Sequence, residues 1–207
     1  MGTGNVPVRV TWSAATDAGG SGAATYDVAR STDGGALTTI ATQITGTSYS
    51  TTVSGNHTHR FQVRARDWAG NVGPWKPGTT LRVGVTQQTS GSIAYTGSTW
   101  PTASSTSFTG GSVRYSTTAG AKASYLFTGR GVAFVSTRGP NRGSANIYID
   151  GTLAATVSLY HSSLSYRYVA FQKSWSTSGS HRISVVVAGT AGHPRVDVDA
   201  FEVVSTP

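Results

Sequence analysis

Apolar and polar residues alternate along almost the whole chain, in short runs that Gly, Asn, Asp and Pro interrupt. Such runs, separated by turn residues about every 8 to 12 positions, predict β-strands. No stretch repeats apolar residues at helical spacing, so the pattern predicts at most a turn of helix. We therefore expect an all-β protein, and its 207 residues are enough for two β-sandwich domains.

The first 85 residues carry the pattern of one sandwich. The expected strands are PVRVTW, ATYDVARS, LTTIATQ, SYSTTV and HRFQVRARD, followed by a tail through GPWKPGTTLRV. Trp12 near the start, the alternating Phe61, Val63 and Ala65, and the ending RARDWAGNVGPW resemble the fibronectin type III fold. The resemblance implies a fibronectin-III-like domain over residues 1–85, with Trp12 packed in its core.

The sequence departs from that family in two places. The first strand is short or absent before Val6, and His59 stands where the family usually has a corner tyrosine. His57 and His59 share one face of a strand, but no third metal ligand is near them in the sequence. We therefore expect a water-exposed pair of histidines at a strand edge.

A polar stretch, GVTQQTSGS, follows the first domain, and we assign residues 86–92 to a linker. The second domain is expected over residues 93–207, and its most informative segment is GRGVAFVSTRGPNRGSANIYIDG, residues 129–151. Apolar runs predict two strands here, and Asp150-Gly151 predicts a tight hairpin turn after the second strand. The loop between the strands contains Arg138, Asn141 and Arg142, whose planar groups can hydrogen-bond hydroxyls or carboxylates.

The motif RGPNRGSANIYIDG and the terminal RVDVDAFEVV resemble the galactose-binding-like jelly-roll modules appended to secreted bacterial glycosidases and surface proteins. Those modules mostly bind carbohydrate, so the resemblance implies a second, jelly-roll domain of a carbohydrate-binding type. Related jelly rolls often hold a structural calcium ion between the first and last strands. The resemblance thus implies Asp199, with Asp197 beside it, as calcium ligands. The alternative for these two carboxylates is pairing with Arg195, Arg182 or backbone amides.

Carbohydrate binding requires an exposed aromatic ring for the apolar face of a pyranose and polar groups for its hydroxyls. In the second domain we expect stacking on Trp100 or Tyr160, with Trp175 as a further candidate, and hydrogen bonds from His161 and the loop side chains at 138, 141 and 142. The alternatives are core packing for each aromatic residue and a solvated loop for the arginines.

Enzymatic activity is not expected. No serine has a glycine two positions before and after it, and the chain lacks a phosphate-binding glycine loop and a paired-histidine metal helix. Asp197 and Asp199 lie on one strand, whereas glycosidase carboxylates normally face each other across a cleft. The chain has no cysteine, which excludes disulfides, thiolate nucleophiles and Cys-bound zinc.

The net charge of +8 is spread along the chain without a dense basic run or aromatic interleaving, so no nucleic-acid partner is expected. No apolar run is long enough to insert into a membrane, and the first 20 residues lack the features of a signal peptide. We expect polysaccharide or a cell-surface glycan as the partner. The chain would then belong to a secreted, bacterial cell-surface protein whose signal lies upstream and which carries further domains. The alternatives are a structural spacer without a ligand and an adhesive, protein-binding module.

Overall fold

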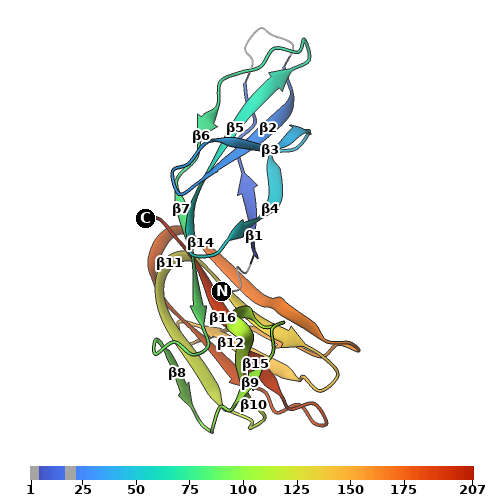
Figure 1. Ribbon diagram of the computed structural model, residues 1–207, viewed down its shortest axis with the longest axis vertical. Helices are drawn as coiled ribbons and strands as arrows, with labels where there is room; N and C mark the ends of the chain where they lie inside the picture. The colour runs from blue at the N-terminus through green and yellow to red at the C-terminus, as the bar shows by residue number, and fades with distance from the viewer. Residues whose placement is uncertain (1–4, 17–21) are drawn as a thin grey trace. The chain divides into compact units, whose positions relative to one another are not determined.

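The computed structural model describes residues 5–16 and 22–207. They form two compact units, Asn5–Val83 and Gly84–Ser205, here called the N-terminal unit and the C-terminal unit. Within the described residues, the regular structure is β-strand except for one turn of 3₁₀ helix at Thr109–Gly111 (Figure 1). The all-β sandwich expected from the residue pattern is confirmed. No helix in the described part of the chain is long and apolar enough to cross a bilayer.

The N-terminal unit contains two sheets. Its strands are β1 (Asn5–Thr11), β2 (Ala23–Thr32), β3 (Thr38–Ile44), β4 (Ser48–Ser54), β5 (His57–Asp67), β6 (Lys76–Pro77) and the first part of β7 (Leu81–Gln87). Strand β1 pairs with β4, while β5 pairs with β2, β6 and β7, and β3 pairs with β2. Val28, Val53 and Val83 are almost fully buried between these strands. The assignment of this unit to the fibronectin type III fold stays a prediction.

The two histidines of β5 do not form the exposed pair that the sequence predicts. His59 is only 1% exposed, and its Nε2 lies 2.9 Å from the carbonyl oxygen of Ser54. His57 is partly exposed, and its Nδ1 lies 2.5 Å from a carboxylate oxygen of Asp33. The expectation is wrong for His59 because this imidazole finds a backbone partner inside the unit, as a buried polar group requires.

The expected linker also differs from the structure. Residues 86 and 87 are the last two residues of β7, and Gln88 is 2% exposed. The Gln88 backbone N–H donates to the carbonyl oxygen of Asp199, and its side-chain amide donates to the Ser112 hydroxyl at 2.6 Å. Polar composition suggested a free segment, but these distant partners fix Gln88 within the C-terminal unit.

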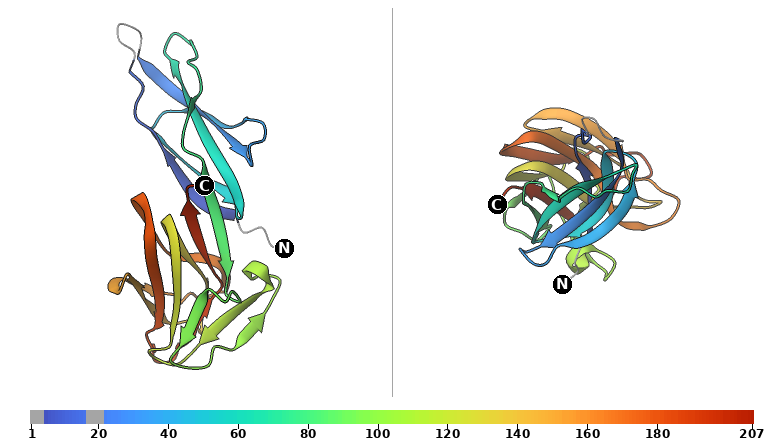
Figure 2. Two further views of the ribbon diagram at one scale, coloured as in Figure 1. Left: turned by 90° about the vertical axis from the view of Figure 1, so that its left-hand side faces the viewer. Right: turned by 90° about the horizontal axis from the view of Figure 1, so that it is seen from above.

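The C-terminal unit is built from nine further strands and the end of β7. The strands are β8 (Ile93–Thr96), β9 (Thr102–Ser104), β10 (Ser112–Ser116), β11 (Lys122–Arg138), β12 (Ser144–Ile149), β13 (Thr152–Ser158), β14 (Ser165–Val187), β15 (Val196–Val198) and β16 (Ala200–Ser205). One sheet has the order β15-β10-β9, and the other contains β13-β12-β14-β11-β16, with β8 also on β11. Figure 2 shows the long strands β11 and β14 running side by side, as their pairing requires.

Alternation along the strands builds the core of this unit. In β12, Ala145, Ile147 and Ile149 are buried while the residues between them are partly exposed, which is the two-residue period of a strand. Asp150 and Gly151 then join β12 to β13 with φ values of 51° and 84°. Two consecutive positive φ values are typical of a type I′ hairpin turn, so the predicted turn is confirmed.

Candidate functional site

The loop between β11 and β12, residues 139–143, is clamped by two segments from later in the chain. The N–H of Gly139 donates to the carbonyl of Leu159 at 3.0 Å, and the N–H of Leu159 donates to the carbonyl of Gly143 at 2.9 Å. The N–H of Gly143 donates in turn to the carbonyl of Arg195. A Cβ at Gly143 would overlap the carbonyl oxygen of His193, so this close approach requires glycine. The loop is therefore held by backbone contacts on both sides.

A buried ion cluster lies under this loop. The Asp197 side chain is fully buried and accepts from Arg142 Nε at 3.0 Å, from Arg142 Nη2 at 2.7 Å and from Arg195 Nε at 2.6 Å. The guanidinium of Arg195 also stacks over the Tyr115 ring, 3.8 Å from its centroid. Two cations and several hydrogen bonds compensate the buried carboxylate, which without them would be strongly unfavourable.

The sequence suggested that Arg142 faces a ligand, but in the structure it does not. It is 6% exposed, and its guanidinium turns inward to Asp197. The physical reason is that a carboxylate buried on β15 needs a counterion, and Arg142 supplies it from the loop. Its role is to position the loop.

Arg138, at the end of β11, is half-buried. The Cζ of its guanidinium lies over the Tyr168 ring, 3.8 Å from the centroid, in a cation–π arrangement. Its Nε is buried without a hydrogen-bond partner among the described residues. Tyr168 thus fixes the orientation of Arg138, a contact between residues 30 positions apart that the local sequence pattern does not reveal.

Four exposed residues and one half-exposed residue lie in or next to the clamped loop, and we call them the Tyr160 rim. The exposed residues are Pro140, Asn141, Tyr160 and Leu164, and the half-exposed one is His161. The segment around Tyr160 is tied to the loop by a parallel bridge between Gly139 and Tyr160, and by the His161 N–H donating to the Gly139 carbonyl at 3.2 Å. Tyr160 is 53% exposed and Leu164 is 49% exposed. The rim combines an accessible ring with polar side chains.

Two further contacts fix the rim. The Tyr160 ring meets the His193 ring edge-on, with 5.0 Å between centroids, and His161 Nδ1 lies 2.8 Å from the carbonyl oxygen of Ser163. A Cβ at Gly139 would lie 2.7 Å from Leu164 Cδ2, so the Leu164 side chain covers this glycine. His193 was missed by the sequence analysis because it lies 33 residues after Tyr160 in an irregular segment.

Trp100 does not belong to the rim. It is 8% exposed and packs in the core against Tyr95, with ring centroids 5.1 Å apart. Its Nε1 donates to the carbonyl of Thr96 at 3.4 Å. The predicted stacking role is therefore wrong, and core packing, the alternative, holds because this large ring gains more by burial between the sheets.

Trp175 is also separate from the loop. Its ring stacks on His181 at 4.0 Å with an interplanar angle of 13°, so one face is covered. Its neighbour Ser174 pairs with Gly131, whereas Ser165 pairs with Arg138 at the other end of the same pairing. These two pairs are seven positions apart on β11, a span of roughly 23 Å, so the structure does not bring Trp175 together with the Tyr160 rim.

The two carboxylates expected to bind calcium have other partners. Asp197 is occupied by the two guanidinium groups described above, which agrees with the predicted alternative for Arg195. Asp199 accepts from the Thr109 N–H at 3.0 Å and from its hydroxyl at 3.2 Å. The described residues contain no group of three or more His, Asp or Glu side chains placed to hold a metal ion. Asp197 therefore does not fit a calcium site, while calcium at Asp199 stays a prediction.

Asp199 and Glu202 are two buried acids without a cationic ion-pair partner among the described residues. Burial raises the pKa of Asp199 to about 7, against the hydrogen bonds from Thr109 that favour its charged form. Burial also raises the pKa of Glu202 to about 7, and the charge of Asp199 adds to that effect. One carboxyl oxygen of Glu202 has no hydrogen-bond partner in the described structure. Both carboxyl groups therefore stay protonated to a higher pH than exposed carboxyl groups do.

No family model matches the chain. A segment of 113 residues is 31% identical to an A type blood N-acetyl-alpha-D-galactosamine deacetylase of Flavonifractor plautii, covering 55% of this chain and 14% of that protein. Exoglucanase A of Cellulomonas fimi is 37% identical over 105 residues, 50% of this chain and 11% of the enzyme. Exoglucanase B of the same organism is 40% identical over 96 residues, 45% of this chain and 8% of the enzyme. The chain thus spans only a small part of each of these curated relatives.

Solved structures give a weaker likeness. The CBM36-1 domain of a multidomain xylanase from the hindgut metagenome of Trinervitermes trinervoides has a TM-score of 0.45 and 14% identity, covering 61% of this chain and 98% of that domain. A family two carbohydrate esterase from Cellvibrio japonicus has a TM-score of 0.45 and 14% identity, covering 61% of this chain and 34% of the esterase. At these scores the structural likeness supports no inference about function.

Proposed function

We propose that the chain is a non-catalytic carbohydrate-binding region of a secreted bacterial protein, and that it binds polysaccharide at the Tyr160 rim. The named relatives support this proposal because they are carbohydrate-active enzymes of which the matching segment forms only a small share. Matches of about 100 residues, which make up 8 to 14% of a deacetylase and of two exoglucanases, are more consistent with an accessory module than with a catalytic domain. On this proposal, the C-terminal unit is a jelly-roll binding module and the N-terminal unit a fibronectin-III-like one.

The observation that carries the proposal is the exposed ring of Tyr160. A tyrosine that is 53% exposed and held edge-on by His193 offers a fixed aromatic face to a ligand. The apolar face of a pyranose can lie against such a ring, and little ordering entropy is lost because the ring is already positioned.

Hydrogen bonds at the rim would come from Asn141 and His161. Asn141 is exposed, and its Oδ1 accepts from Arg142 Nη1, which leaves the amide N–H groups directed away from that contact. His161 is half-exposed, and its Nδ1 is engaged with Ser163, so Nε2 is the nitrogen available to a sugar hydroxyl. Arg142 acts only through the loop, by holding it to Asp197.

A spacer without a sugar ligand is the second candidate. It is favoured by the burial of Trp100 and Arg142, two side chains that the sequence placed in the binding site and that the structure removes from it. The two candidates differ in whether the Tyr160 rim has any ligand.

Isothermal titration calorimetry of the whole chain against a panel of soluble neutral and acidic polysaccharides tests the proposal. We expect saturable binding of at least one polysaccharide, with a dissociation constant on the order of micromolar to millimolar. Absence of binding to every member of the panel by the folded chain contradicts sugar recognition and leaves the spacer.

A further inference from the structure

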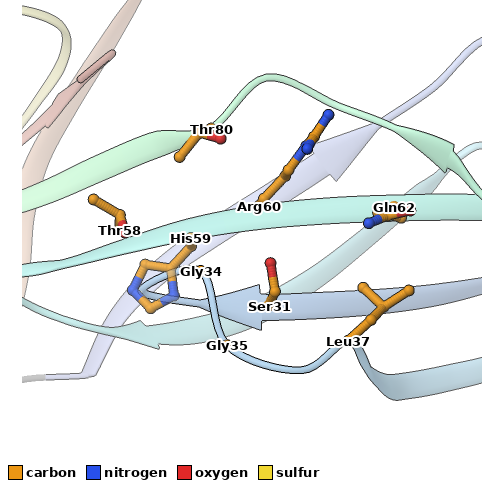
Figure 3. A pocket seen from close by; sticks show the side chains of 9 residues that line it. All are labelled: Ser31, Gly34, Gly35, Leu37, Thr58, His59, Arg60, Gln62 and Thr80. Carbon is orange, nitrogen blue, oxygen red and sulfur yellow. The ribbon is translucent and has the colours of Figure 1, made fainter.

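The N-terminal unit contains a pocket of about 320 Å³, and none of its lining residues is among those discussed as sugar contacts. It is lined by Ser31, Gly34, Gly35, Leu37, Thr58, His59, Arg60, Gln62 and Thr80. Figure 3 shows Arg60 and Gln62 on β5, Ser31 on β2, and Leu37 on the segment after the turn that follows β2. The volume is at the lower end of the range of small-ligand pockets, roughly 300–1,000 Å³.

The strand register explains why polar side chains gather here. Ser31 pairs directly with Arg60 across β2 and β5, and Gln62 lies two positions further along β5 on the same face. Phe61, between them, points to the other face and is 6% exposed in the core. The pocket thus occupies the polar face of the sheet, while the opposite face holds the apolar core.

The pocket is electrostatically one-sided. Its lining includes the cationic residue Arg60 and no acidic residue. Arg60 Nε donates to the carbonyl of Gly78 at 3.2 Å, which anchors the side chain, and its terminal nitrogens form no ion pair with the described carboxylates. By contrast, Arg64 and Arg66 on the same strand are both paired with Asp27. The Arg60 side chain is therefore held in place by Gly78 and has no carboxylate partner among the described residues.

Asp33, which directly precedes the lining residue Gly34, already has several hydrogen-bond donors. One carboxylate oxygen of Asp33 accepts from the N–H and the hydroxyl of Thr58, at 2.8 and 3.1 Å, and the other contacts His57. Asp33 is thus turned toward its own donors and does not supply the counterion of Arg60. His59 lines the pocket as well, but both of its ring nitrogens are engaged, with Thr32 and Ser54.

We propose that this pocket binds a carboxylate-bearing sugar unit, with Arg60 pairing with the carboxylate. An arginine fork matches the planar geometry of a carboxylate, and such charge-assisted pairs are stronger than neutral hydrogen bonds. The hydroxyl groups of Ser31 and Thr80 and the amide of Gln62 supply contacts for sugar hydroxyls, and Leu37, which is 38% exposed, borders the site with an apolar surface. This second site stands independently of the Tyr160 rim and of the function proposed for it.

Nuclear magnetic resonance titration of the ¹⁵N-labelled whole chain tests the proposal, with sodium galacturonate as the probe and galactose as its uncharged counterpart. We expect saturable shifts of the Gly34, Gly35 and Gln62 amides with galacturonate, with a dissociation constant on the order of millimolar, and no such shifts with galactose. A third titration uses sodium acetate, which carries the carboxylate without the sugar ring. Equal affinity for acetate and galacturonate would overturn the sugar part of the proposal, because only the carboxylate would then be recognised.

The variant Arg60→Gln should weaken galacturonate binding about tenfold or more, since it removes the charged fork. Arg9→Gln is the matched control because it removes the same charge from β1 of the same unit, outside the pocket lining. Gln62→Leu provides a second variant of similar shape and should weaken binding several-fold. Unchanged affinity in Arg60→Gln and Gln62→Leu, or equal losses in Arg9→Gln, contradicts the site. Tyr160→Ala should leave the Gly34 and Gly35 shifts unaltered, so failure at one site is distinguishable from failure at the other.

Discussion

The buried cluster under the Tyr160 rim predicts a large effect of Asp197→Asn. The substitution removes the only carboxylate that Arg142 and Arg195 contact within the described structure, through bonds of 2.6, 2.7 and 3.0 Å. Arg142 has a side-chain exposure of 7% and cannot regain full hydration, whereas Arg195, at 19%, can turn partly to water. Breaking a buried ion pair by removing one partner costs about 3–5 kcal/mol, and the partial exposure of Arg195 places the expected loss near the lower end.

Urea unfolding followed by the amide resonances of buried strands in the C-terminal unit measures this loss. A decrease of about 3 kcal/mol in the free energy of unfolding corresponds to a melting temperature lower by roughly 10 °C for a unit of this size. Asp150→Asn is the matched control. Asp150 is an exposed turn residue whose carboxylate contacts His181 and the Arg182 N–H, and asparagine tolerates its positive φ of 51°.

The control should cost no more than about 1 kcal/mol, as expected for exposed ion pairs. If Asp197→Asn is no more destabilising than Asp150→Asn, the reasoning that the buried carboxylate organises the loop is refuted. Resonances of the N-terminal unit should keep their wild-type unfolding behaviour, which confines the effect to the unit that contains the cluster.

Two further predictions concern the same unit. Gly143→Ala should destabilise it by about 1–3 kcal/mol because the added Cβ overlaps the carbonyl oxygen of His193. Gly91→Ala is the matched control, because a Cβ at this position meets no atom within 4 Å and neither glycine has a positive φ. Equal stability of Gly143→Ala and the wild type in urea would contradict the close approach. Burial raises the pKa of Asp199 and of Glu202 to about 7 in the folded chain, above their unfolded values, so the free energy of unfolding should fall as the pH rises from about 4 to about 7. Asp199→Asn should reduce this pH-dependent change in the free energy of unfolding by at most about 4 kcal/mol, as measured by urea unfolding at several pH values. If the free energy of unfolding of the variant depends on pH as steeply as that of the wild type, the raised pKa of Asp199 is contradicted.

The residue pattern was sufficient to predict the β-strands and one turn. Alternation in β12 and the Asp150-Gly151 pair depend on local geometry, which two or three neighbouring residues determine. The position of the loop before β12 could also be predicted, because the loop begins and ends close to where the apolar runs stop.

The sequence was not sufficient to predict which side chains of the loop face outward. Arg142 contacts Asp197, 55 positions later, and nothing in the local pattern distinguishes an arginine that pairs with a buried carboxylate from one in solvent. The local pattern does not predict the burial of Trp100 either, because this burial depends on packing between strands that are distant in the sequence. At Tyr168, irregular pairing between β11 and β14 and a φ of 53° at Arg167 interrupt the two-residue alternation, so the strand pattern does not reveal that this ring lies under Arg138.

Sugar recognition by the Tyr160 rim is tested most directly by comparing Tyr160→Ala with Leu153→Ala, since both wild-type side chains are 53% exposed in the C-terminal unit. Calorimetric titration of each variant uses the polysaccharide that the wild type binds most tightly. Loss of a stacking ring should cost about 2 kcal/mol or more, which is roughly a 30-fold weaker affinity, while Leu153→Ala should bind within about twofold of the wild type. Wild-type affinity in Tyr160→Ala would contradict sugar recognition at this rim.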